Sequence, residues 1–486
     1  MDSTTEARPR KGFFGHPRGL MNLFGVEMWE RFSYYGLTGI VGLYMWYSAQ
    51  DGGLGQSKAA AMSIVGAYGG LIYVSAIVGS WIADRLLGAE RTVFYGAVVV
   101  VIGHLSLAIL PGLVGLGVGL FCVAVGGGAL KGNASVIVGM LYEEKDGRRD
   151  AGFSIFYMGI NIGGLAGTIF TGAVGEKIAF HYGFGLAAIG MIIGLIQYTL
   201  GRRNLPESAS SVPNPLPPSE RTKYLVAWLG LVVVIVLAVA LGVITALNLS
   251  DVVAVVAGVA AVAYFVLMLT SDKVTPVEKS RVRAFIPLLV ASVAFWSLFQ
   301  QLYTVMPVYA EGRIDRMLFG WEMPVSWVAN AINPVFIILL AGVFAVLWTK
   351  LGPRQPSTPT KIALGPILVG VGFLLFLTVA GGGAGSVPLL AFFGFLLVFT
   401  IAELFISPVG LSTATKLAPE AFRSQMMGLW FLSVAMGSSL AGTIGQYYHE
   451  DSEASYFGIV GAGAIVVGLA VLALRPWISK QMSGVR

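Results

Sequence analysis

Long apolar runs dominate the sequence and restrict the chain to a membrane-spanning helical fold. Each run is roughly 18 to 28 residues long, the length that an α-helix needs to cross the hydrocarbon core of a bilayer. Only 12% of the residues are charged, whereas soluble globular proteins carry about 25%. The sequence predicts an all-α polytopic membrane protein with fourteen spans, at 20–48, 60–86, 92–110, 113–141, 152–175, 179–200, 222–247, 252–271, 284–310, 324–350, 361–381, 387–416, 424–447 and 455–474.

Lysine and arginine are distributed unevenly between the two predicted membrane faces. Of the 31 basic residues, 25 fall in the tails and loops on the side of the N-terminus, and 4 fall on the opposite side. Because positive residues accumulate in cytoplasmic loops, we expect both termini in the cytoplasm and the protein in the cell membrane. The net charge of +6 needs no nucleic-acid partner, since the basic residues spread over one membrane face.

Two polar segments divide the chain and are expected to be solvated cytoplasmic linkers. The helices between them carry no charge in their middles, which favours a structural insertion. Without this pair, six spans precede and six follow, the arrangement of secondary transporters with a site between two bundles. The predicted division is a tail 1–19, a six-helix bundle 20–200, a linker 201–221, a helix pair 222–271, a linker 272–283, a second six-helix bundle 284–474 and a tail 475–486.

Charged side chains inside the predicted spans are the best candidates for function, because each is costly in hydrocarbon unless it is paired. They are Glu27, Glu30, Arg31, Lys131 and Glu403. The first three are followed by Tyr34 at a spacing that places all four on one helix face. Ion pairs that hold helices together are the alternative explanation. Two cations against three carboxylates nevertheless leave one carboxylate as a natural proton acceptor, so we hypothesise a proton-coupled cycle.

Polar residues and prolines recur near these charges. Tyr157 and Asn161, at i and i+4, share one face of the fifth span, and Asn333 directly precedes Pro334 in the eighth. Pro408 lies in the tenth span, five residues after Glu403. A proline frees a backbone carbonyl and bends a helix, which supports gates and cavity-lining groups in transporters. A static packing kink is the alternative explanation for each proline.

Other features have structural explanations that compete with functional ones. The aromatic candidates for lining a pocket also suit packing or interfacial anchoring; they are Tyr34, Tyr35, Tyr68, Tyr73 and Trp430. The glycines at 126–128 lie within a span and favour close helix packing over nucleotide binding. A hydrogen-bonded structural role is favoured for His104. A single cysteine, Cys122, excludes an intrachain disulfide and fits no metal cluster.

A charged turn joins the second and third spans. It reads Asp84-Arg85-x-x-Gly88-x-x-Arg91. Charge pairing across such a tight loop suggests a conformational latch and not a substrate contact.

Several motifs together resemble one known family. They are Glu27-x-x-Glu30-Arg31-Phe32-x-Tyr34-Tyr35-Gly36, Lys131 in the fourth span, Phe156-Tyr157-x-x-Ile160-Asn161-x-Gly163-Gly164, and Glu403-Leu-Phe-Ile-Ser407-Pro408-Val-Gly410. Over essentially the whole chain, including the extra helix pair, the sequence is similar to the proton-dependent oligopeptide transporter family of the major facilitator superfamily. The segment 79–91 resembles the loop motif of that superfamily.

The resemblance implies a proton-coupled symporter that imports di- and tripeptides by alternating access. Arg31 and Lys131 would face the peptide carboxylate, and Glu403 would hold the amino terminus. The implied peptide-binding residues are Arg31, Tyr34, Tyr68, Lys131, Tyr157, Asn161, Asn333, Glu403, Trp430 and Ser433. The implied proton-coupling residues are Glu27, Glu30, Lys131 and Glu403, with Glu30 able to pair with Lys131. The implied gating residues are Asp84, Arg85, Arg91, Pro334 and Pro408.

The same resemblance implies no catalytic residue, no metal and no cofactor, with protons as the co-transported ion. Small peptides and the lipid bilayer are the expected partners, and we expect a functional monomer.

The chain departs from the family pattern at the seventh span. Members commonly carry an acidic residue after a Phe-Trp pair, but Phe295-Trp296-Ser-Leu-Phe is followed by Gln300 and Gln301. Because glutamine cannot titrate, proton coupling should depend more on the first span. The second-span histidine of mammalian relatives is also missing, since residues 60–86 contain none.

Two alternatives remain open. One is a carrier of another amine-bearing or anionic solute, such as a drug, a modified amino acid or nitrate; an anion carrier has no need for Glu403. The other is a membrane-embedded enzyme or sensor, which should show grouped reactive side chains near a membrane surface. The histidines are instead scattered, at His16, His104, His181 and His449, so we do not expect an enzyme.

Overall fold

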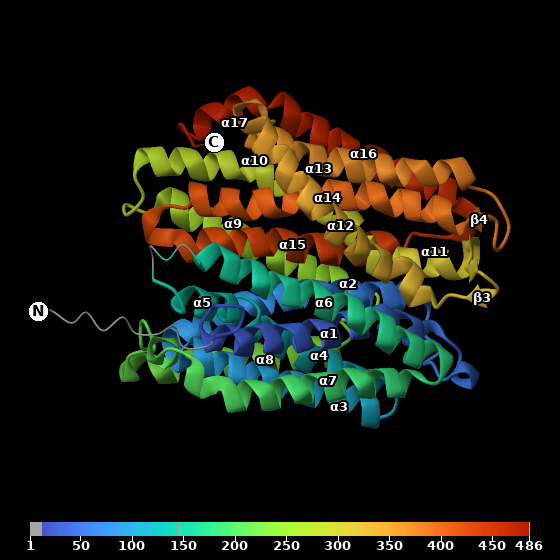
Figure 1. Cartoon of the computed structure of the whole chain (residues 1–486), viewed down its shortest axis with the longest axis horizontal. Coiled ribbons are helices and arrows are strands. Elements are labelled where there is room, and N and C mark those ends of the chain that lie inside the picture. Colours follow the sequence, from blue (N-terminus) through green and yellow to red (C-terminus); the bar gives the residue numbers. More distant parts are fainter. Residues whose placement is uncertain (1–11, 144–145, 147, 486) are drawn as a thin grey trace, which may run out of the picture.

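The protein is a bundle of long, roughly parallel helices arranged in two stacked groups (Figure 1). The structure is a computed structural model that describes residues 12–143, 146 and 148–485. Helices from the first part of the chain form the lower group in Figure 1, and helices from the last part form the upper group. The beginning of α1 and the short helix α17 lie at the same, left end of the bundle. We call this end the terminal end and the opposite end the far end.

The first group runs from α1 to α7 and is held together mainly by α1, which packs along α6 and α7, and by α3, which packs along α4. The Ser57 side chain caps the start of α2 by accepting a hydrogen bond from the Ala60 N–H. The helices are α1 (Arg18–Trp46), α2 (Lys58–Ile82), α3 (Ala89–Ile109), α4 (Gly112–Leu130), α5 (Asn133–Met140), α6 (Arg149–Lys177) and α7 (Phe180–Gly201).

The second group runs from α10 to α17, after a pair of intervening helices, α8 (Pro218–Ala240) and α9 (Leu249–Thr270). Within it, α13 packs along α14 and α16, and α10 along α15. The helices are α10 (Pro276–Phe299), α11 (Val305–Arg313), α12 (Ile332–Leu351), α13 (Thr358–Leu375), α14 (Leu389–Leu417), α15 (Arg423–Gly445), α16 (Glu453–Ala473) and α17 (Arg475–Gln481).

The prediction of an all-α membrane fold with fourteen spans is confirmed. Thirteen helical stretches in the described part of the chain are long and apolar enough to cross a membrane. The 29-residue α1 lies alongside them and adds a further span that carries Glu27, Glu30 and Arg31. In the part of the chain that the structure describes, four two-residue strands interrupt the helical pattern. They pair between loops, β1 (Ile314–Asp315) with β4 (Val387–Pro388) in parallel and β2 (Met317–Leu318) with β3 (Trp321–Glu322) in antiparallel register.

The two groups contact each other most extensively along α2 and α15. Glycine makes this approach possible, because a Cβ atom at Gly66 would lie 2.6 Å from the Cα of Gly442. Small residues at such crossings let two backbones meet without a side chain between them. The α2–α15 contact therefore fixes how the two groups sit against each other.

The first linker is more ordered than the prediction of a solvated segment. Its Ala209 and Leu216 side chains are buried. The N–H groups of Asn214 and Leu216 donate to the carbonyls of Asp84 and Arg85, at 3.0 and 2.9 Å. These carbonyls lie in a π-helical turn, 83–87, after α2. The linker thus packs against the loop between α2 and α3, because its few apolar residues and its backbone find partners there.

The helix pair also differs from the prediction in detail. α8 begins at Pro218, within the predicted linker, and ends at Ala240. Residues 241–248 form a turn, in which Asn248 Nδ2 donates to the Val243 carbonyl at 2.8 Å. No residue of α8 is buried, whereas one stripe of α9 is. α9 therefore packs against the rest of the bundle with one face, whereas α8 stays exposed along its length.

Candidate functional site

Arg31 in the middle of α1 holds both neighbouring glutamates. Its Nε lies 3.0 Å from Glu27 Oε1 and 2.8 Å from Glu30 Oε2, and all three side chains are buried. The helix geometry explains this, because positions three and four apart share one face. The two Nη groups of Arg31 make no hydrogen bond to any residue in the described part of the chain. They remain free to bind an anionic ligand.

Lys131 lies where the fourth span is interrupted. α4 ends before it, and Gly132 takes a φ of +95° before α5 begins, a conformation that glycine adopts at little cost. The Lys131 ammonium lies over the ring of Tyr73, 3.7 Å from the centroid. The expected Glu30–Lys131 ion pair is not formed in the described structure, although Lys131 acts electrostatically on Glu30. Arg31 is closer to Glu30 and takes that place.

Glu403 in α14 is the charged residue of the second helix group that corresponds to Arg31 and Lys131 in the first. Its Oε2 accepts a hydrogen bond from Asn333 Nδ2 at 3.3 Å, and the same amide donates to Thr400 Oγ1 at 3.0 Å. Asn333 is the second residue of α12, directly after a π-helical turn at 327–331. No cation among the described residues lies within ion-pair distance of Glu403. Its carboxylate is therefore available to a cationic ligand.

Three tyrosines connect the two charged groups electrostatically. The charges of Arg31 and Glu403 both act on the hydroxyl of Tyr73. They also both act on Tyr35 and on Tyr157. Because such effects fade with distance, these tyrosines lie near Arg31 and near Glu403 at once. Arg31 from the first group and Glu403 from the second therefore lie near the same tyrosines.

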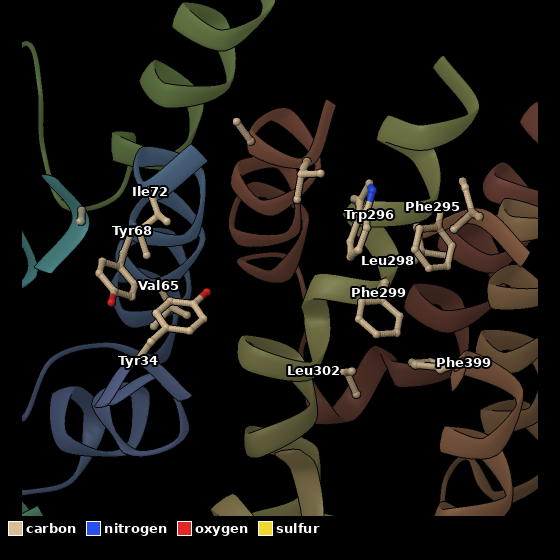
Figure 2. Close-up of a cluster of buried hydrophobic side chains, with 14 of the residues drawn as sticks. Tyr34, Val65, Tyr68, Ile72, Phe295, Trp296, Leu298, Phe299, Leu302 and Phe399 are labelled. Atoms are coloured by element: carbon tan, nitrogen blue, oxygen red, sulfur yellow. The ribbon is translucent and has the colours of Figure 1, made fainter. Parts of the chain in front are cut away.

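The Tyr34 and Tyr68 rings lie next to each other, as the left part of Figure 2 shows, tilted by 33° with centroids 6.1 Å apart. The Arg31 guanidinium lies 5.7 Å from the Tyr34 ring centroid. The Tyr68 hydroxyl is buried without a hydrogen-bond partner among the described residues. Tyr73, five residues further along α2, is instead the ring over which the Lys131 ammonium lies. Sequence reasoning named Tyr73 as a pocket candidate but did not place it among the binding residues.

Trp430 and Ser433, both on α15, contact the neighbouring helices of the second group. A Cβ atom at Gly410 would overlap the Trp430 indole, so this glycine lets the ring approach α14 closely. Ser433 is fully buried; its hydroxyl is 2.7 Å from that of Ser292 and donates to the Trp430 carbonyl. Ser433 therefore joins α15 to α10.

The fifth-span pair is confirmed as one helix face. Asn161 Nδ2 donates to the Tyr157 carbonyl at 2.9 Å within α6. The Tyr157 side chain is 60% exposed although the charges of Arg31 and Glu403 act on it. Tyr157 is thus exposed and lies near the charges of both helix groups.

The glutamines that replace the family's acid lie at a second interruption. α10 ends at Phe299, and a 3-10 turn at 300–303 leads to α11. Gln300 Nε2 donates to Ser438 Oγ at 2.9 Å. The Tyr456 hydroxyl donates to Gln301 Oε1 at 2.8 Å. Both amides therefore hold the second group of helices together.

The gating candidates are dispersed. The charge pairing expected within the turn after α2 is not observed among the described residues; Arg85 instead pairs with Glu220 of α8, at 3.6 Å. The reason is that α8 starts beside this turn and offers a carboxylate. Asp84 and Arg91 are exposed. Pro334 follows the π-helical turn of the eighth span, and Pro408 lies inside the continuous helix α14.

Contacts at the far end close the molecule there. Trp46 Nε1 donates to Glu311 Oε2 at 3.0 Å, and Lys58 lies 4.0 Å from Glu311 and 3.8 Å from Glu450. Further hydrogen bonds join α6 at this end to the segment before α12: the Glu176 carboxylate accepts from the Val325 and Ser326 N–H groups, and Trp327 Nε1 donates to the Ile169 carbonyl. Among the described residues, these contacts hold the bundle shut at the far end.

Glu176 completes this closure and was not found from the sequence. Its carboxylate accepts hydrogen bonds from the N–H groups of Val325 and Ser326, at 2.6 and 2.9 Å, and from the Ser326 hydroxyl. A carboxylate is favourable at a helix start, where N–H groups lack partners. Glu176 lies at the end of α6, where a solvated residue is the ordinary expectation. Nothing in its neighbouring sequence signals the partner.

Comparison with known proteins agrees with this arrangement. The family model described as PTR2: POT family matches residues 90–460. A di-/tripeptide transporter of Lactococcus lactis subsp. lactis (strain IL1403) is 41% identical over 495 residues, with 99% of each chain covered.

Two solved structures are similar over nearly the whole chain. A peptide transporter POT in complex with sulfate has 43% identity, 98% coverage of both chains and a TM-score of 0.93. A POT family transporter in complex with 5-aminolevulinic acid has 40% identity, 97% coverage of this chain, 98% of that chain and a TM-score of 0.91. The protein is thus a multi-pass membrane transporter and not an enzyme, and it belongs to the POT family.

Proposed function

We propose that the protein imports di- and tripeptides together with protons by alternating access. The observation that carries this proposal is the placement of two opposite charges around one set of tyrosines. Arg31 offers free Nη groups from α1, and Glu403 offers a carboxylate without a cation from α14. A short peptide is a zwitterion whose two ends match these groups. Because the ends contact different helix groups, the substrate itself would draw the groups together.

The ligands of similar proteins support this chemistry. The relative with 41% identity is named a di-/tripeptide transporter. Sulfate, in one similar structure, is an anion, and 5-aminolevulinic acid, in the other, combines an amine with a carboxylate. For this chain we assign the peptide carboxylate to Arg31 and Lys131. We assign the amino terminus to Glu403 with Asn333 and Asn161, in a pocket bordered by Tyr34, Tyr68, Tyr73, Tyr157 and Trp430.

We assign proton coupling to the carboxylates near Arg31 and Lys131. Glu27 and Glu30 share one guanidinium, so protonation of either carboxyl would release part of Arg31 for a ligand. Lys131 could then leave the Tyr73 ring for Glu30 or for the peptide. Glu403, which has no cation, would exchange its proton for the peptide amine. Gln300 cannot take part, because its amide does not titrate.

The distribution of basic residues supports an orientation with both termini in the cytoplasm. The terminal end would then face the cytoplasm, and the far end, closed by Glu311 and Glu176, would face outward. The complete set of charges on one chain also supports function as a monomer in the lipid bilayer, with no cofactor besides the transported proton.

Uptake of labelled dialanine into proteoliposomes tests the proposal. We expect accumulation only with an inward proton gradient, and we expect collapse of the gradient to abolish it. The Arg31→Lys variant keeps a charge but cannot bridge two carboxylates and a ligand, so it should lose most uptake. If dialanine fails to accumulate while 5-aminolevulinic acid or another amine-bearing solute does, the alternative of a different substrate on the same scaffold is correct.

A further inference from the structure

The intervening helix α9 lies in the groove between the two helix groups. It packs against α2 of the first group and against α15 of the second. Its buried residues form one stripe along the helix, Ser250, Val253, Ala257, Ala261 and Met268. The neighbouring α8 buries no residue. Only one member of the pair is therefore built into the contact between the groups.

The start of α9 is hydrogen-bonded to both groups at once. Ser250 Oγ is 3.2 Å from Ser63 Oγ of α2, and the Ser250 N–H donates to the same oxygen at 3.3 Å. From α15, Thr443 Oγ1 lies 3.0 Å from Ser250 Oγ and 2.6 Å from Asp251 Oδ1. Ser63 and Ser250 are fully buried. Buried hydroxyls are costly to leave without partners, so this junction resists being opened.

The junction lies where α2 and α15 are closest. A Cβ atom at Gly442 would lie 2.7 Å from the Met62 carbonyl, 3.0 Å from the Gly66 Cα and 3.2 Å from the Ser250 Cβ. Three helices thus meet without space between them. Ser63 lies near the start of α2 and Thr443 near the end of α15, so the meeting point is at the far end.

We propose that α9 is a clasp that holds the far end closed and sets how often it opens. For that end to open, α2 and α15 must separate. Ser250 cannot follow both helices, so at least one set of its hydrogen bonds must break. The helix pair is then a component of the conformational equilibrium and not a passive insertion. This inference rests on the proposed alternating access, but it concerns the resting populations and not the substrate.

Spin-label distances across the far end provide the test. In a Cys122→Ser background, labels at Gln50→Cys and Asp451→Cys report the separation of the first and second groups, since both positions are exposed. Full-length protein in liposomes is measured by pulsed dipolar spectroscopy without peptide. We expect Ser250→Ala, Ser63→Ala and Thr443→Val each to raise the population with the longer distance at least about five-fold, because each removes at least one hydrogen bond of the junction.

The controls separate a clasp from general destabilisation. Thr270→Val removes a hydroxyl from the other end of α9, where it donates to its own helix at Val266, and should leave the distances unchanged. The effect of the double variant Ser63→Ala with Ser250→Ala should be smaller than the sum of the two single effects, because both single variants remove the Ser63–Ser250 hydroxyl contact. The three variants act from three helices, so failure of one to fold leaves the others.

The clasp is refuted if all three variants give the wild-type distance distribution. It is also refuted if Thr270→Val changes the distribution as strongly as they do. Dialanine uptake in the same liposomes is a separate readout. Loss of uptake by the wild type would contradict the proposed substrate but would leave the distance result standing.

Discussion

Lys131 lies on the ring of Tyr73, with its Nζ 3.7 Å from the ring centroid, while the nearby Glu30 is held by Arg31. The lysine therefore has a neutral partner in this state and two anionic alternatives, Glu30 and a peptide carboxylate. A cation over an aromatic face is worth about 0.5 to 2 kcal/mol, less than a desolvated ion pair at short distance. Tyr73 can thus hold Lys131 without preventing its transfer to an anion.

Two substitutions of Tyr73 distinguish the contribution of its aromatic ring to peptide binding from that of its hydroxyl. Tyr73→Leu removes the face on which Lys131 lies, so we expect the half-saturation concentration for dialanine to change about ten-fold. Tyr73→Phe keeps the face and should change it by less than about three-fold. Concentration-dependent uptake in proteoliposomes measures both values. Equal effects of the two variants would show that the hydroxyl, and not the ring, is what matters.

Glu403→Gln should weaken binding of the peptide amine. The change preserves the shape and one acceptor for Asn333 but removes the charge, so affinity for dialanine should fall about ten- to a hundred-fold. N-acetyl-dialanine, which has no cationic amine, should bind wild type and variant equally. Glu322→Gln, an exposed carboxylate paired with Arg316, is a matched control. If N-acetyl-dialanine loses as much affinity as dialanine, Glu403 does not contact the amine.

Glu27→Gln and Glu30→Gln should uncouple transport from protons. Each removes one carboxylate from Arg31 but leaves a side chain of the same shape. We expect gradient-driven accumulation to fall at least about ten-fold, while exchange of labelled for unlabelled peptide continues in part. Parallel accumulation and counterflow assays distinguish the two activities. Accumulation by both variants at the wild-type rate would exclude these residues from coupling.

Gly410→Ala should disturb the contact between α14 and Trp430. The added methyl group would overlap the indole, and overpacking of this kind costs about 1 to 3 kcal/mol. Gly394→Ala, in the same helix, meets nothing within 4 Å and should be neutral or slightly stabilising. Thermal unfolding in detergent compares the two. A shift of the same size and sign for both variants would show that helix propensity alone is responsible.

Much of the fold follows from the sequence because length and hydropathy locate each span independently. The face shared by Glu27, Glu30 and Arg31 also follows, since it depends only on the geometry of α1. How one helix is rotated against another is not encoded locally. Tyr68 and Tyr73 both lie on α2, and only packing decides which of them meets Lys131.

Contacts between distant segments were missed for the same reason. The partner of Glu176 is the start of a helix almost 150 residues away, and Ser433 is turned toward α10 by the packing of α15. The first linker resembles a solvated segment in composition, yet two buried apolar residues and two backbone hydrogen bonds dock it. Local sequence patterns therefore located the charged and polar residues inside the spans better than they predicted which of these residues contact each other.

The free carboxylate of Glu403 has an electrical consequence. A zwitterionic peptide brings no net charge, so every proton that enters with it moves one elementary charge across the bilayer. At a membrane potential of about 100 mV this contributes roughly 2.3 kcal/mol per charge. Import would then be driven by voltage as well as by acidity. A peptide with a lysine side chain, if it is accepted, would carry a larger current per molecule than dialanine.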